Sequence, residues 1–229
     1  MHRILILLLV LGCGAPQLRK MSSPHYAQKD WTGATMRIVP LQDSVTVRAH
    51  GVSVFVFEYL DYDFATQTAE DALEAKFNQY FRAGLAERSK LKIPALDPAF
   101  EVPHLSEREF PYQQGTTLKL LLPTGNGIST AAKKSQPEFL LFIQDLTFDV
   151  REQYLSGRIR KVYLRLSFDY AIWDNAERRA ATVGKVSLSE SASFQVKRGT
   201  FEPTFSERTW EKTISKAAAE LLKNTPFAK

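Results

Sequence analysis

The chain has 229 residues, 44% of them apolar and 24% charged, and a formal net charge of +5. These values are typical of a soluble globular domain with a sizeable core. The single cysteine excludes an internal disulfide, so the core must provide the stability alone. The basic residues are scattered apart from Arg158/Arg160/Lys161 and Arg178/Arg179, which fits solvated turns or contact with anionic lipid headgroups and argues against nucleic-acid binding.

The chain begins with the three parts of an export signal: a positive start, the apolar run Ile4–Leu11 and a small residue, Gly12, before Cys13. A helix of this run spans about 12 Å, far less than the ~30 Å hydrocarbon core, so it is too short to cross a membrane. Cutting after Ala15 would place Pro16 next to the cleaved bond, which ordinary signal peptidases reject. We therefore expect residues 1–12 to be removed as a signal peptide.

The sequence Val10-Leu11-Gly12-Cys13 resembles the bacterial lipobox, with Gly12 and Cys13 matching well and Leu11 bulkier than usual. The resemblance implies a lipoprotein in which Cys13 is the lipid attachment site, carrying diacylglycerol and a further acyl chain such as palmitate. Several acyl chains make a permanent membrane anchor. Because Gly14 and not aspartate follows, the resemblance implies the outer membrane, facing the periplasm; the inner membrane and the cell surface are the alternatives.

Residues 13–32 carry prolines and serines but few apolar side chains, which predicts a lipidated N-terminus followed by a flexible tether. Fully extended, this tether reaches at most about 65 Å. We expect residues 33–229 to form a single periplasmic domain that stays near its membrane.

The first half of this domain combines strands with one helix. Short apolar runs between turn residues predict strands over 36–41, 45–49 and 52–59, the last rich in β-branched and aromatic residues and therefore central. Apolar residues at three- and four-residue steps then predict an amphipathic helix over 68–88.

An irregular insert follows over residues 93–137. It holds six of the eleven prolines, which excludes a long regular element apart from a short one at Thr117–Leu122. It is nevertheless too apolar for a linker, because it contains side chains such as Phe100, Leu105 and Phe110. We expect the insert to pack over the domain, and the alternative is a partner-binding excursion.

The second half predicts an antiparallel meander and a closing helix. Segments 139–150, 162–172 and 186–196 alternate between apolar and polar residues and are joined by short polar turns, which is typical of a sheet with one apolar and one wet face. The helix expected over 210–222 covers the apolar face. The wet face would carry Arg165, Lys185, Ser187 and Ser189.

These elements predict an α+β fold: an antiparallel or mixed sheet of about five strands, two main helices packed on one face, and the Pro-rich insert between the halves. The segments Val52–Asp61, Tyr163–Trp173 and Thr182–Phe194, together with their helices, resemble the small periplasmic lipoprotein domains of the TolB N-terminal, CsgG-like, LpoB-like and LptE-like families. The resemblance is one of architecture. It implies an accessory role in envelope assembly or transport.

Candidate chemistry in the sequence is sparse. Asp61 and Asp63 stand two apart but lack a third ligand, the histidines are isolated, and Ser129-Thr130 has no recognisable base. We therefore expect no catalytic residues, no metal site and no cofactor. Turn or core positions explain the remaining candidates, which are His25, His50, His104, Asn126, Trp31, Trp173 and Trp210.

The leading hypothesis is a non-enzymatic, membrane-anchored accessory or adaptor of the cell envelope. Its partners would be the membrane, through the lipid on Cys13, and an envelope protein that meets the sheet edge, the wet face or the insert. The alternative is a ligand-binding or hydrolytic periplasmic domain for lipid, glycan or peptide, with a pocket between helix 68–88 and the insert. A ring or pore subunit built on strands within 139–194 is a third hypothesis.

Overall fold

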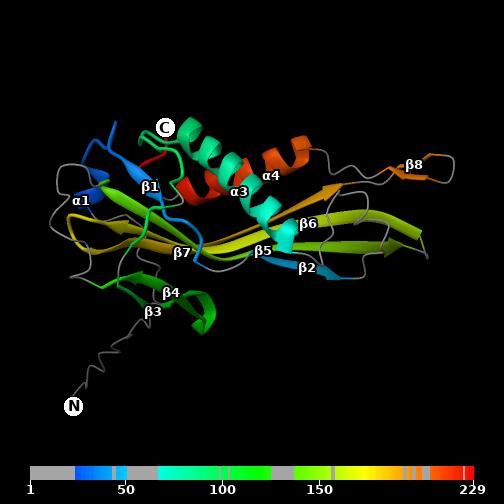
Figure 1. The fold of residues 1–229 in the computed structure, drawn as a ribbon, viewed down its shortest axis with the longest axis horizontal. Coiled ribbons are helices and arrows are strands. Elements are labelled where there is room, and N and C mark those ends of the chain that lie inside the picture. The colour runs from blue at the N-terminus through cyan, green and yellow to red at the C-terminus, as the bar shows by residue number, and fades with distance from the viewer. Residues whose placement is uncertain are drawn as a thin grey trace, which may run out of the picture.

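The computed structural model describes residues 24–42, 45–50, 67–97, 99–102, 104–124, 137–155, 158–192, 195–197, 200–202, 207–223 and 225–229 (Figure 1). The helices of this part are α1 (Pro24–Ala27), α3 (Gln67–Arg88) and α4 (Glu207–Leu222). The strands are β1 (Met36–Ile38), β2 (Thr46–His50), β3 (Leu105–Pro111), β4 (Thr117–Pro123), β5 (Phe139–Leu155), β6 (Arg158–Asp174), β7 (Arg179–Ala192), β8 (Gln195–Lys197) and β9 (Thr200–Glu202).

The main sheet has five strands and is mixed, which is one of the two predicted alternatives. β5, β6 and β7 form the expected antiparallel meander, in which short turns allow consecutive strands to pair. β1 and β2 both pair with the other edge of β5 and run parallel to it, with Met36 opposite Phe139 and Thr46 opposite Thr147. The fold class is therefore α+β, with the long meander as its frame.

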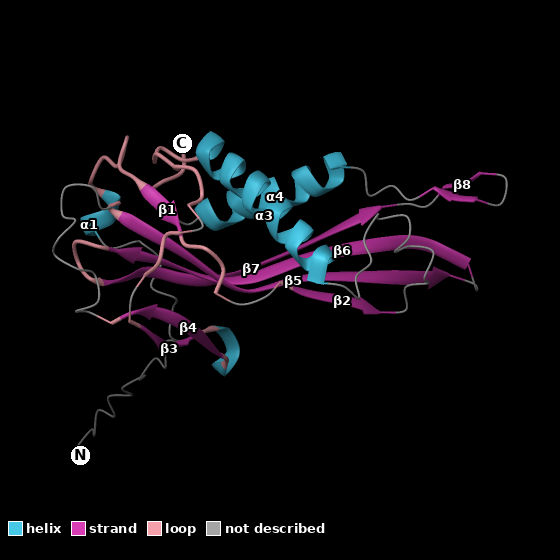
Figure 2. Cartoon of the chain, viewed as in Figure 1, coloured by secondary structure: helices cyan, strands magenta, loops and turns pink. Residues whose placement is uncertain are grey.

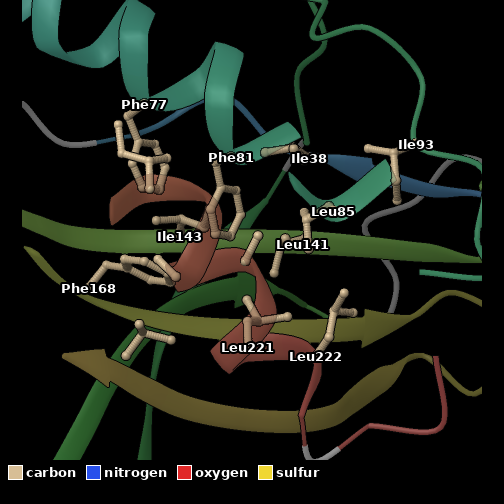
Figure 3. Close-up of a cluster of buried hydrophobic side chains, with 14 of the residues drawn as sticks. Ile38, Phe77, Phe81, Leu85, Ile93, Leu141, Ile143, Phe168, Leu221 and Leu222 are labelled. Atoms are coloured by element: carbon tan, nitrogen blue, oxygen red, sulfur yellow. The ribbon is translucent and has the colours of Figure 1, made fainter. Parts of the chain in front are cut away.

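The two long helices cover one face of this sheet, which also confirms the prediction (Figures 1 and 2). Phe77 and Phe81 of α3 stack at 4.8 Å between ring centroids and both meet the edge of Phe168 at 5.5 to 5.6 Å. Figure 3 shows these rings pointing down onto β5 and β6, with Leu221 of α4 on the same side. The helices cross closely at Gly84, where an added Cβ would lie 3.1 Å from Ala218. This layer is the larger of the two apolar cores.

A β-bulge in β5 keeps the apolar side chains of this strand on the helical side. The pairing with β6 shifts between Gln144 and Thr147, and Asp145 has a φ of 52°. Before the bulge, Leu141 and Ile143 face the helices; after it, Leu146 and Phe148 do. Side chains alternate strictly between the two faces of a strand. The extra residue of the bulge shifts this alternation by one, so that odd-numbered residues before it and even-numbered residues after it face the helices.

The insert forms a β-hairpin, β3–β4, on the opposite face of the sheet (Figure 2). Leu120 and Leu122 pack there against Leu140, Phe142 and Trp173, forming a second core. The expectation that the insert packs over the domain is confirmed, and the short regular element expected at Thr117–Leu122 is the strand β4. Two details are corrected. β3 was not expected, and the second face of the meander is wet only beyond the hairpin.

The packed domain begins before residue 33, so the predicted tether is too long. Tyr26 and Trp31 are 3% and 5% exposed, and Trp31 lies edge-on to Phe139 at 4.9 Å. The Tyr26 hydroxyl donates a 2.8 Å hydrogen bond to the buried carboxylate of Asp174, and the Trp31 indole N–H donates to the Tyr26 carbonyl. The low apolar content of this segment was misleading, because two buried aromatic side chains are enough to hold it against the domain.

Several strand limits also differ from those expected. β1 ends at Ile38 rather than 41, because Pro40 has no N–H to continue the ladder. β7 begins at Arg179 rather than 186; its first residues are paired around a second irregularity, opposite Ile172 and Trp173, that obscures the alternation. The strand expected over 52–59 lies outside the described residues.

Candidate functional site

Beyond the hairpin, the face of the sheet opposite the helices is polar, and no other described helix or strand covers it (Figure 2). Its side chains come from alternate positions of β5, β6 and β7, so the register aligns them in rows across the strands. We call this surface the polar face; its described members are Thr147, Asp149, Arg165, Ser167, Asp169, Lys185, Ser187 and Ser189. The four residues expected on the wet face, Arg165, Lys185, Ser187 and Ser189, are all exposed here.

On the polar face, the carboxylates lie deeper than the cations. Asp169 pairs with Lys185 on the neighbouring strand at 2.9 Å, yet the carboxylate side chain is 7% exposed and the lysine 41%. Asp149 is 5% exposed and stands opposite the exposed Arg165 in the β5–β6 register. Arg165 Nε also donates a 3.1 Å hydrogen bond to Ser187 Oγ. The described carboxylates of this face are thus buried, and its described cations face the solvent.

The hairpin forms a raised border of the polar face and is fixed by Gln144. Gln144 is 4% exposed, and its side chain pairs with β4 as a neighbouring strand would: its amide donates to the Leu121 carbonyl at 2.9 Å and its oxygen accepts from the Leu121 N–H at 2.9 Å. Arg108 of β3 adds a contact, with its guanidinium 5.4 Å from the centre of the Trp173 ring. The border therefore has a defined position relative to Asp169 and Lys185.

A groove of about 650 Å³ lies on the helical side, where the ends of α3 and α4 meet β7 and residues 228–229. Two of the cations that line it, Arg88 and Lys229, are engaged at the end of α3, and the other two, Lys216 and Lys223, pair with Glu190 and Glu220. Lys229 Nζ donates to the Glu87 carbonyl at 2.6 Å, and Arg88 lies 2.8 Å from Ser215 Oγ and 2.7 Å from the Glu87 carboxylate. These cations satisfy carbonyl groups and the negative end of the helix dipole. The lining consists of Glu87, Arg88, Leu188, Lys216, Ala219, Glu220, Leu222, Lys223, Ala228 and Lys229.

This groove is not at the predicted position. We expected a pocket between helix 68–88 and the insert. The start of the insert, Ile93 and Leu96, packs into the core on the side of α3, but the β3–β4 hairpin covers the opposite face of the sheet. Because the meander separates them, the described residues of these two elements cannot line one pocket.

The other candidate residues are spread through the molecule. His25 and His104 are exposed, and Trp31, Trp173 and Trp210 are buried core residues, as expected. Within the described part of the chain, no cluster of three potential metal ligands occurs and no helix is long and apolar enough to cross a membrane. Outside the described residues or side chains lie Cys13, His50, Asp61, Asp63, Asn126, Ser129 and Thr130.

The sequence predicts the exposed residues of the polar face but not the burial of its carboxylates. The alternation in β6 and β7 is enough to place Arg165 and Lys185 on a wet face. Asp169 follows the same alternation and looks equally exposed in the sequence. The signal that could have been noticed is Gln144, a polar residue that directly follows the apolar run Phe139–Ile143.

No family model matches the sequence, and no curated protein does. Among solved structures, the chain is similar to a PelC dodecamer subunit from Paraburkholderia phytofirmans at 9% identity, covering 86% of this chain and 91% of that one with a TM-score of 0.31. A protein described as a lipoprotein from Caulobacter crescentus shows 10% identity, 80% and 87% coverage and a TM-score of 0.34. A DUF330 protein from Xanthomonas campestris shows 10% identity, with 87% of this chain and 86% of that one covered and a TM-score of 0.33. Likenesses at this level say nothing about what this chain does.

Proposed function

We propose that this chain is a lipid-anchored, non-enzymatic accessory protein of the bacterial cell envelope that holds an envelope protein on its polar face. The anchor would be the acylated Cys13, on the outer membrane and facing the periplasm. The observation that carries the proposal is the polar face itself, a row of exposed cations and hydroxyl groups on a rigid sheet, bordered by a hairpin at a fixed position. Such a surface presents polar groups to a partner at little conformational cost.

The anchor is tested by metabolic acyl labelling of the native chain and of Cys13→Ser, followed by separation of the two membranes. We expect label and outer-membrane association for the native chain and neither for the variant. Equal labelling of both would contradict the proposal, as would an unlabelled native chain.

The docking surface is tested by placing a photocrosslinking amino acid at Ser187 in living cells. The control position is Glu211, an exposed residue of α4 on the other side of the molecule. We expect one dominant envelope protein at Ser187 and none at Glu211. No protein adduct at Ser187, or the same adducts at both positions, would exclude the polar face as the docking surface.

The second candidate function, binding of a lipid, glycan or peptide ligand, is favoured by one observation, the groove at the end of α3 and α4. It is the weaker candidate because the cations that line the groove already have partners, at the end of α3 or on Glu190 and Glu220. A ligand soak of crystals that filled this groove and left the polar face empty would reverse the order.

A further inference from the structure

We propose that the polar face binds an extended acidic segment of the partner protein, which lies beside the β3–β4 hairpin and brings carboxylates to Arg165 and Lys185. This inference rests on the proposed function and adds the chemistry of the partner. It follows from three features of the described surface: which charges are accessible, how they are spaced, and what shape the hairpin leaves open.

The accessible charge is positive although the face contains carboxylates. Asp169 and Asp149 are each 5% exposed, whereas Arg165 is exposed and the Lys185 side chain is 41% exposed. An approaching molecule therefore meets the ammonium and guanidinium groups first. Carboxylates are the protein groups that both cations bind best, and guanidinium can bind them through two hydrogen bonds.

The strand positions of the two cationic residues fit an extended chain. Lys185 pairs with Asp169, and Arg165 lies four residues from Asp169 along β6. With about 3.3 Å per residue and ~4.8 Å between strands, the Cα atoms of Arg165 and Lys185 are about 14 Å apart. Side chains four residues apart in an extended peptide are separated by about 13 Å.

Hydroxyl groups lie between the two cations. Ser167 and Ser187 are directly paired in the β6–β7 register, midway between the level of Arg165 and that of Lys185. A hydroxyl can donate and accept, so it can bind either the N–H or the carbonyl group of a peptide backbone. The centre of the polar face therefore suits the main chain and its two ends suit acidic side chains.

The hairpin argues against a membrane as the occupant. It packs face to face on the same side of the sheet, where stacked sheets lie about 10 Å apart. A flat bilayer would touch the hairpin before it reached Arg165. A narrow chain can instead lie on the open sheet next to the hairpin, which the two Gln144 hydrogen bonds hold in place.

The test uses the lipidated protein in mild detergent and a labelled peptide with two glutamates four residues apart on a serine and valine background. The same peptide with glutamines is the matched control. We expect saturable binding of the glutamate peptide that weakens as salt is raised, and no binding of the glutamine peptide. Equal binding of the two peptides would overturn the inference.

Charge reversal locates the site. Arg165→Glu should weaken binding of the glutamate peptide by about tenfold or more. Lys212→Glu makes the same change in net charge on the exposed side of α4 and should leave binding unchanged. Lys185 neutralises a buried carboxylate, so Lys185→Gln could lose stability. Its peptide binding is therefore compared with that of the native chain only if its unfolding curve is native-like. If it is not, the site is judged from Arg165→Glu alone. Equal loss in Arg165→Glu and Lys212→Glu would overturn the site.

Other polyanions separate the inference from the proposed function. Polygalacturonate and phosphatidylglycerol vesicles are offered in place of the peptide. If either binds through Arg165 and the peptide does not, the acidic-segment inference is wrong. If the crosslink at Ser187 persists in that case, the proposed docking function still stands; if no crosslink forms at all, the proposed function fails by itself.

Discussion

At the scale of single residues, Asp145 determines which side of β5 is apolar. It is exposed and has a φ of 52°, a conformation that costs L-residues about 1–2 kcal/mol and that aspartate accepts better than most. The Thr147 hydroxyl donates to the Asp145 carbonyl at 3.2 Å and helps to hold the bulge. The strand accepts this local strain because both Ile143 and Phe148 then face the helices.

Replacing Asp145 by valine should destabilise the domain, because a β-branched side chain is strained at positive φ. We expect Asp145→Val to be about 1–2 kcal/mol less stable than Asp145→Gly, which adopts this conformation freely. Urea unfolding of both variants measures the difference. Equal stability of the two would show that the bulge is not needed.

Tyr170 gives the stability a dependence on alkaline pH. Burial, with smaller contributions from Tyr112 and Glu220, raises the pKa of its hydroxyl from 10.0 to about 12. The ring lies over Gly184, where an added Cβ would come within 2.8 Å of it, so this position accepts no larger residue without a shift of the ring. The neutral phenol is therefore the form that the folded chain favours.

Above about pH 10 the unfolded chain loses the Tyr170 proton while the folded chain keeps it, so stability must fall as pH rises toward 12. The slope from this group is about 1.4 kcal/mol per pH unit. The variant Tyr170→Phe has no hydroxyl at this position and therefore lacks this pH-dependent contribution. Between about pH 9 and about pH 11, the unfolding free energy of the native chain should therefore fall by about 1.4 kcal/mol more than that of Tyr170→Phe. A constant difference would refute the assigned pKa.

At the scale of elements, the sequence predicts what is determined locally. α3 and α4 were found because each packs against one layer, which imposes helical spacing on residues such as Phe77, Phe81 and Leu221. β3 was missed because none of its residues is fully buried and it ends at Pro111. Its position depends on pairing with β4 and on Gln144, which is distant in the sequence.

The same reason limits the prediction of the site and of the N-terminal segment. Exposure of Arg165 follows from alternation along one strand, but alternation along β6 does not show that Asp169 is buried and paired with Lys185 of β7. Tyr26 reaches Asp174, a residue 148 positions away, and no local pattern in the sequence indicates that contact. Long-range contacts of single side chains are thus what the sequence left open.

The attachment of the hairpin can be tested at Gln144. Gln144→Ala removes both hydrogen bonds to Leu121, and we expect the Leu121 amide proton to exchange with solvent at least about tenfold faster, equivalent to roughly 1.4 kcal/mol. Hydrogen exchange resolved by residue is the measurement. The amide of Leu166, in the centre of the meander, is the internal control and should not change. Unaltered exchange at Leu121 would mean that the apolar contacts alone hold the hairpin.

At the scale of the whole molecule, the described helices cover only part of the sheet. α3 and α4 lie over its middle, and β5 and β6 continue past them (Figure 1). A strand of 17 residues such as β5 is about 57 Å long. α1 sits at the opposite end, where its Tyr26 meets Asp174. If Cys13 carries the lipid, the ten residues 14–23 can separate that end from the bilayer by at most about 35 Å.

This arrangement predicts which end of the domain is near the membrane. Cys13 is the only cysteine and is acylated in our proposal, so a cysteine introduced at Ala27 or Ser189 can be labelled alone with a fluorophore. A headgroup-borne quencher should reduce the signal at Ala27 more than at Ser189, which lies further along the strands. Equal quenching would show that the domain lies flat on the bilayer.

The packing of Tyr26 and Trp31 also has a mechanical consequence. If the lipid is held in one membrane and the polar face holds a partner that moves, tension enters the domain at residues 24–32. The Tyr26–Asp174 hydrogen bond and the contact between Trp31 and Phe139 would break one after another, at low force. β1 runs parallel to β5, so further pull would load its ladder in shear, which resists far more because its bonds share the load. The segment can thus lengthen the connection under load while the sheet that carries the partner stays folded.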